Sequence, residues 1–168
     1  MATQLYSNVS PPVSTHAVTV NTAFLEDIKR DNIRLKSLLQ EARSVCEACP
    51  FGRVWRIRLA TLLGDLRDVL ALHFTLEEFY GYFEEPLAVA PHLAERAKRL
   101  RAQHVDLYDA ISFLADMAAD LAAAGDDVFR VQQLATCYIQ FHNRLLEHEA
   151  GEDELITDAY NVDIGVGD

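Results

Sequence analysis

Residues 134–159, LATCYIQFHNRLLEHEAGEDELITDA, place their large side chains at alternating intervals of four and three residues. Spacing of this kind puts side chains on one face of an α-helix. The positions on that face are Leu134, Tyr138, Phe141, Leu145, His148, Glu152, Leu155 and Ala159. One histidine and one glutamate interrupt an otherwise apolar face, and the apolar period continues beyond them. The stretch therefore predicts a core-facing helix that carries two polar side chains into the core.

Working outward from this stretch, three further segments show the same period. Prolines at 50, 86 and 91 and the sequence Gly125-Asp126-Asp127 separate the segments. Proline is poorly tolerated inside a helix, while glycine suits a helix end and aspartate a helix start. We predict helices over 21–48, 53–84, 91–123 and 127–160. Short connections make consecutive helices antiparallel neighbours, so the expected fold is all-α, an up-down-up-down antiparallel four-helix bundle.

Length and charge limit the classes of protein to consider. The 168 residues suit one domain, which we place at 21–160, with an N-terminal arm at 1–20 and a C-terminal tail at 161–168. Acidic residues outnumber basic ones by 26 to 15, for a net charge of −11. This balance argues against nucleic acid and anionic membrane surfaces as partners. The sequence shows no signal-peptide pattern and three cysteines make no disulfide framework, so we expect a cytoplasmic protein.

Six polar residues occupy core-facing positions of the four predicted helices. A buried carboxylate is costly unless it is paired or bound to metal, and two buried carboxylates repel each other. Counted from the predicted turns, the six positions differ in height by only two or three residues, which is about 3–5 Å at the helical rise. They should therefore form approximately one layer. The six are Asn32, His73, Glu77, His104, His148 and Glu152.

The spacing within this layer fits metal ligation. His73-Phe-Thr-Leu-Glu77 and His148-Glu-Ala-Gly-Glu152 are both His-x-x-x-Glu, and residues four apart share a helix face. Imidazole and carboxylate together suit iron, manganese or zinc. Two glutamates facing each other across a core can bridge two cations, whose charge offsets the burial cost. We predict His73, Glu77, His104, His148 and Glu152 as metal ligands. Asn32 is left open between a weak ligand, a partner of a ligand and an ordinary core residue.

Two His-x-x-x-Glu motifs with His104 between them resemble the hemerythrin-like HHE cation-binding domains, over about residues 21–160. The resemblance implies a non-haem di-iron centre in which Glu77 and Glu152 bridge and the histidines complete the coordination. It also implies oxygen, nitric oxide or peroxide as ligand, or a role in sensing or handling iron. Asn32 stands where the family has its first-helix histidine. The oxygen carriers proper end on His-x-x-x-x-Asp, whereas the helical period here favours Glu152.

Three functions follow as alternatives. The first is a metal-binding protein that binds or senses a small ligand or handles iron. The second is an oxidase- or peroxidase-type di-iron enzyme, since the same ligands serve binding and catalysis. The third is a metal-free helical interaction module, for which Asn32 is the best argument. The protein partner of a sensor is not given by the sequence.

Residues beside the layer carry further expectations. His142 is predicted to flank the core or face solvent, and a role behind a metal ligand is its alternative. Glu78 and Glu149 are predicted to face water or a neighbouring helix, although a rotated helix would bring one of them inward. Tyr138 is expected to be a core aromatic whose hydroxyl is hydrogen-bonded. The pair at 46 and 49 has the spacing of half a zinc site or a redox pair. The helical period also explains Cys46 and Cys49 as small buried residues, which we favour.

Overall fold

The fold was analysed in a computed structural model, which describes residues 22–48, 52–79, 83–125 and 127–161. All elements in these ranges are helical. They are α1 (Thr22–Glu47), α2 (Arg53–Phe79), α3 (Glu84–Val89), the 3-10 helix η1 (Pro91–Leu93), α4 (Ala94–Ala124) and α5 (Val128–Asn161). The all-α prediction is confirmed. The predicted arm at 1–20, residues 162–168 of the tail predicted at 161–168, and Cys49 lie outside the described residues.

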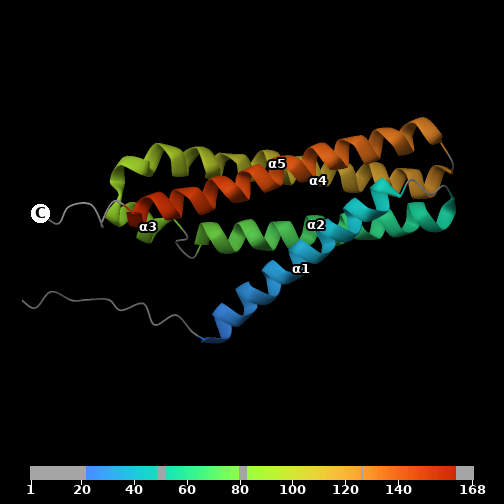
Figure 1. The fold of residues 1–168 in the computed structure, drawn as a ribbon. Coiled ribbons are helices and arrows are strands. Elements are labelled where there is room, and N and C mark those ends of the chain that lie inside the picture. Colours follow the sequence, from blue (N-terminus) through green and yellow to red (C-terminus); the bar gives the residue numbers. More distant parts are fainter. Residues whose placement is uncertain (1–21, 49–51, 80–82, 126, 162–168) are drawn as a thin grey trace, which may run out of the picture.

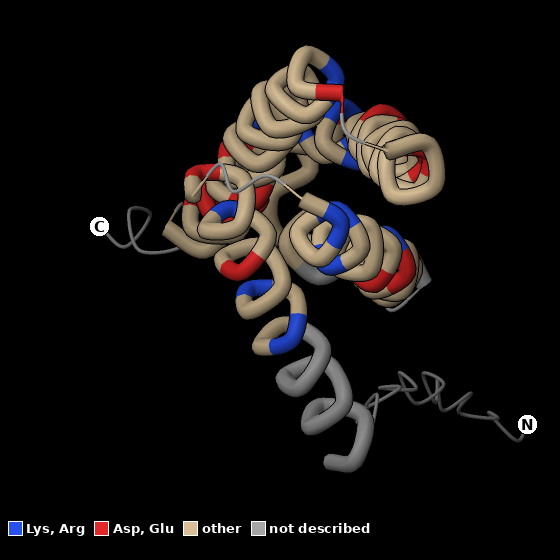
Figure 2. Tube along the Cα trace, turned by 90° about the vertical axis from the view of Figure 1, so that its right-hand side faces the viewer, with Lys and Arg blue, Asp and Glu red and all other residues tan. Residues whose placement is uncertain are grey.

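The long helices pack side by side (Figure 1). Helix α2 contacts α1 and α4, and α5 contacts α4, α1 and the short α3. In the view along the bundle, basic and acidic residues are interspersed over the helices (Figure 2). Charged residues of both signs are therefore present along the helices seen in this view.

Two predicted helix boundaries are wrong, and both lie near Pro86. The second helix was predicted to reach residue 84 but ends at Phe79, and the short helix α3 follows. Proline lacks a backbone N–H donor, and the first turn of a helix does not need one. Pro86 therefore lies in the first turn of α3 instead of ending a helix. The third long helix begins at Ala94, after η1, instead of at residue 91.

The turn between α4 and α5 follows the predicted chemistry. Gly125 has a φ of +106°, a left-handed conformation that glycine adopts without steric cost. The backbone N–H of Arg130 donates to Oδ1 of Asp127 over 3.1 Å, which caps the start of α5. Near the start of α2, the indole N–H of Trp55 donates to the carbonyl of Val45 over 2.9 Å and ties α2 to α1.

The core consists of two apolar parts with the polar layer between them. The larger part is built mostly of leucine from all four long helices and extends to Phe74, Leu107 and Leu145. The smaller part contains Phe83, Ala97, Leu100 and Leu155. His104 falls between these two parts on α4 and the His148–Glu152 segment falls between them on α5, while His73 and Glu77 lie on either side of Phe74 at the end of the larger part on α2. The polar residues are therefore enclosed by apolar packing on both sides.

Candidate metal centre

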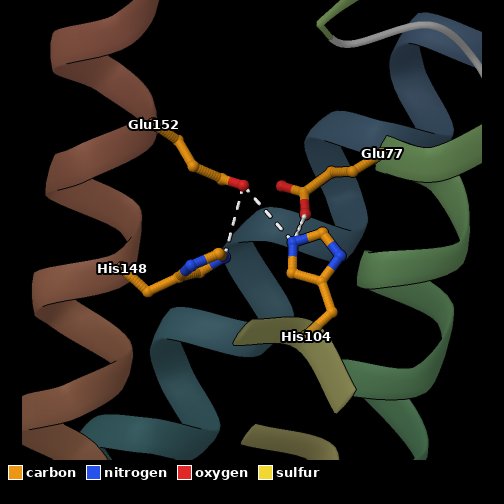
Figure 3. A group of neighbouring side chains, drawn as sticks. All are labelled: Glu77, His104, His148 and Glu152. Atoms are coloured by element: carbon orange, nitrogen blue, oxygen red, sulfur yellow. Dashed lines mark hydrogen bonds and ion pairs between the residues drawn. The ribbon is translucent and has the colours of Figure 1, made fainter. Parts of the chain in front are cut away.

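Three helices bring together Glu77 from α2, His104 from α4, and His148 and Glu152 from α5 (Figure 3). Each residue offers one ligand atom, and these atoms lie within 4.8 Å of one another. His104, His148 and Glu152 are 2–3% exposed and Glu77 is 9% exposed. The structure therefore brings four of the five predicted ligands into one buried group, as expected from the helical periodicity. We call this group the central cluster.

The contacts within the central cluster have the spacing of ligands around one ion. Nε2 of His148 lies 3.2 Å from Oε1 of Glu152, and Nε2 of His104 lies 3.4 Å from the same oxygen. Nε2 of His104 also lies 3.5 Å from Oε2 of Glu77. Ligand atoms ~2.1 Å from a tetrahedral ion are about 3.4 Å apart from one another. The separations therefore fit a shared ion with small side-chain adjustment.

Groups outside the cluster fix which nitrogen of each histidine points inward. Nδ1 of His104 donates to Oε1 of Glu78 over 3.1 Å, since a carboxylate only accepts. Nδ1 of His148 donates to the amide oxygen of Gln103 over 3.0 Å. In both rings Nε2 is the nitrogen that faces Glu152. A ring nitrogen held in this way is the usual arrangement behind a metal-ligating histidine.

An aromatic side chain fixes the planes of the same two rings. Phe74, which is 5% exposed, stacks on His104 with ring centroids 4.2 Å apart and an interplanar angle of 6°. The Phe74 ring also meets His148 edge-on at 5.9 Å. The two inward nitrogens therefore have little freedom to turn away from the carboxylates.

The polar atoms of the central cluster are incompletely satisfied by the protein. Nε2 of His148 and Oε2 of Glu77 are buried and make no hydrogen bond within the described part of the chain. Buried polar atoms without partners cost free energy, and a cation would satisfy both. The donor set of two imidazoles and two carboxylates suits a divalent transition metal. The residues present therefore fit a metal ion.

The acids and bases of the cluster shift one another's pKa values. Burial alone would lower the pKa of His104, but Glu152, Glu78 and Glu77 outweigh burial and raise it. Burial would raise the pKa of Glu152, but His104 and His148 outweigh burial and hold it at about 2. The pKa of Glu77 is raised, mainly by burial. Without a cation, the low pKa of Glu152 therefore depends on the neighbouring imidazoles.

His73, the fifth predicted ligand, lies beside the central cluster. Its Nε2 is 3.1 Å from Oε1 of Glu77 and 3.3 Å from Oε1 of Glu149. Burial lowers the pKa of His73, but Glu149 and Glu77 outweigh burial and raise it to about 10. Glu77 therefore lies between His73 and His104, with one oxygen turned toward each.

Asn32, left open by the sequence, lies on α1 and is partly buried. Its Oδ1 is buried and makes no hydrogen bond within the described ranges. The described residues therefore give this oxygen no hydrogen bond, and the three roles considered for Asn32 all remain predictions.

Several neighbours differ from the sequence expectation or add to it. Of the positions considered for His142, the solvent-facing one is wrong, because His142 is 7% exposed and its Nδ1 lies 3.4 Å from the hydroxyl of Tyr138. Tyr138 is fully buried and donates to the carbonyl of Leu39 over 2.8 Å, as predicted. Cys46 is buried, as predicted. Glu78 and Glu149 both contact histidines on neighbouring helices, which is one of the two outcomes expected for them.

Sequence reasoning missed Gln103 altogether. Its position directly before His104 on α4 was the available signal, because a long amide on the flank of a helix can reach a histidine of the next helix.

Comparison of the chain with protein-family models, with curated proteins and with solved structures found no match. Among the described helices, none is long and apolar enough to cross a membrane.

Proposed function

We propose that this protein binds a transition-metal ion between Glu77, His104, His148 and Glu152. The observation that carries the proposal is the geometry of these side chains. Four ligand atoms from three helices converge within 4.8 Å in the core, and two of them lack a hydrogen-bond partner in the described structure. A buried group of this composition is costly to maintain without a cation.

The finer proposal is a hemerythrin-like, non-haem di-iron protein on an up-down-up-down four-helix bundle. It rests on the resemblance of the two His-x-x-x-Glu motifs to the HHE domains and on the mixed imidazole and carboxylate donor set. Its role would be to bind or sense a small diatomic ligand or peroxide, or to sense or handle iron. Bound iron would supply reversible one-electron chemistry and an open coordination position.

The protein's own residues would prepare the site for that role. His104 and His148 would hold the ion through Nε2, since Glu78 and Gln103 fix the Nδ1 protons on the outer side. Glu77 and Glu152 would neutralise its charge. The apolar parts of the core on either side of the layer would restrict the access of water.

Metal content tests this proposal directly. The full chain, produced with iron and purified under reducing conditions, should retain metal by elemental analysis, and His148→Ala should retain far less. His92→Ala is the matched control, because His92 is exposed and lies away from the layer in sequence. Wild-type protein that holds no metal and melts unchanged when Fe²⁺ is added would contradict the proposal.

A metal-free interaction module is the second candidate, and one observation favours it. The histidines of the layer already have carboxylate neighbours, with His73 beside Glu77 and Glu149, and His104 beside Glu78 and Glu152. Protonated histidines could therefore balance part of the buried charge without a cation. On this reading a chelator leaves the melting temperature unchanged, which the same experiment measures.

A further inference from the structure

Glu149 lies outside the central cluster, but its carboxylate faces the same polar layer. Glu149 follows His148 directly, on the flank of α5 that faces α2. Its side chain is 29% exposed, yet its Oε1 is buried and makes no hydrogen bond within the described residues. That oxygen lies 3.3 Å from Nε2 of His73. The carboxylate is thus turned into the layer instead of out to solvent.

Glu77 connects this position to the central cluster. Its Oε1 lies 3.1 Å from Nε2 of His73, and its Oε2 lies 3.5 Å from Nε2 of His104. One carboxylate whose two oxygens face different ligand groups is the geometry of a bridge between two ions. Ions in such paired sites lie roughly 3.5–4 Å apart.

The separations on the outer side match those of the central cluster. Contacts of 3.1 and 3.3 Å join Nε2 of His73 to the two carboxylate oxygens. Ligands ~2.1 Å from one ion are about 3.0 Å apart at right angles and about 3.4 Å apart in a tetrahedron. His73, Glu77 and Glu149 can therefore hold an ion between them.

We propose that Glu149 completes a second cation subsite with His73 and Glu77, sharing Glu77 with the central cluster. The inference rests on the proposed metal-binding function and extends it to a residue outside both His-x-x-x-Glu pairs. Glu149 would supply the ligand that Asn32, as an amide, supplies poorly. A carboxylate from α5 would then take the place of an imidazole from α1.

The two subsites would differ chemically. The central one contains two imidazoles and Glu152, is almost fully buried, and shares Glu77. The outer one has a single imidazole with two carboxylates and reaches the surface through Glu149. Oxygen-rich ligand sets favour harder cations such as Mn²⁺, while imidazole suits iron and zinc. The outer subsite should therefore bind its ion more weakly and accept manganese more readily.

Anaerobic equilibrium dialysis of the full chain against Fe²⁺, with bound ion per chain from elemental analysis, tests the inference. Wild-type protein should bind close to two ions in a tight and a weak class. Glu149→Gln keeps the shape of the side chain and removes its charge, so it should weaken the second class by at least about tenfold and leave the first. Glu147→Gln is the matched control, because Glu147 is an exposed glutamate on the same helix.

Each alternative result has a definite meaning. Two ions bound with unchanged affinity by Glu149→Gln would overturn the role of Glu149. A wild-type total of one ion would overturn the second subsite and leave the proposed function standing. Wild-type protein that binds no ion would overturn both. Helical circular dichroism and a cooperative melt of each variant exclude loss of fold as the cause of lost binding. Loss of both the tight and the weak class of bound ion in folded Glu149→Gln would also contradict the assignment.

Discussion

Each histidine of the central cluster has one ring nitrogen toward the carboxylates and one toward a hydrogen-bond acceptor. For His104 that acceptor is Glu78, whose side chain is half exposed. Glu78→Gln keeps an acceptor oxygen but removes the negative charge that makes His104 more basic. Changes of this kind typically weaken metal binding about 10–100-fold. Titration with Zn²⁺ should show this loss of affinity. Glu147→Gln is the control and should bind Zn²⁺ like wild type. Equal affinities of Glu78→Gln and wild type would show that the contact between Glu78 and His104 is dispensable.

His142 predicts a specific pH dependence of stability. Burial lowers its pKa, Arg43 lowers it further, and Glu47 opposes them. The folded protein therefore keeps His142 neutral at a pH where the unfolded chain, with a pKa near 6.5, takes up a proton. Stability contributed in this way is present above pH 6.5 and is lost as the pH falls through that value.

His142→Asn removes this titration while keeping a polar side chain beside the hydroxyl of Tyr138. Urea unfolding with chelator present should show a smaller loss of stability between pH 7.5 and pH 5 in the variant than in wild type. The metal layer is the same in both proteins, so its own response to pH cancels in the comparison. Parallel pH profiles would contradict the role assigned to His142.

At the scale of the helices, Gly151 measures how closely α5 approaches α4 at the site, and Gly64 in α2 serves as the unobstructed comparison. A Cβ added at Gly64, within α2, meets nothing within 4 Å, whereas one added at Gly151, within α5, lies 3.1 Å from Cδ2 of Leu100 on α4. Alanine is favoured over glycine within a helix by roughly 1 kcal/mol. Gly64→Ala should show that gain in chemical denaturation, and Gly151→Ala should gain less because Leu100 must move. Equal gains would show that α4 and α5 have room to spare.

The helices also show which features of the fold were predictable. Apolar period and turn residues predicted the four long helices, because both signals are local. The end of α2 at Phe79 and the formation of α3 were missed, since Pro86 was read as the end of a helix and not as part of a first turn. Gly81 was the available signal for an earlier end, because glycine commonly follows a helix.

The candidate site was predictable only where it follows the helical period. Glu77, His104, His148 and Glu152 face inward in that period, and the structure brings them together. Glu149 is adjacent to His148 and so points to the flank of α5, from which its long side chain reaches His73. His142 was misassigned because α1 also packs against α5 and widens the buried face beyond the expected row. Contacts of this kind depend on helix rotation, which spacing along one helix does not specify.

At the scale of the whole molecule, the polar layer makes stability depend on both metal and protons. The pKa of His73 is raised to about 10, so this ring holds a proton near neutral pH when no metal is bound, and the pKa of His104 is also raised by its carboxylate neighbours. Raised values stabilise the metal-free fold below the unfolded pKa of 6.5, and this stabilisation is lost as the pH rises through the folded values. A metal ion has to displace the same protons.

Metal ions and protons should therefore compete for the same histidines, so the stabilisation of the fold by metal should depend on pH. A ligand present at 100 times its Kd stabilises the folded state by about 2.7 kcal/mol. At a fixed excess of Zn²⁺, the rise in Tm over the chelated protein should grow steadily from pH 6 to pH 8, because proton competition weakens. Calorimetric titration in two buffers of different ionisation enthalpy should show proton release on binding. His148→Ala should reduce the rise at every pH, because it removes a ligand of the central cluster. A rise independent of pH in wild type would mean that the ion binds away from these histidines.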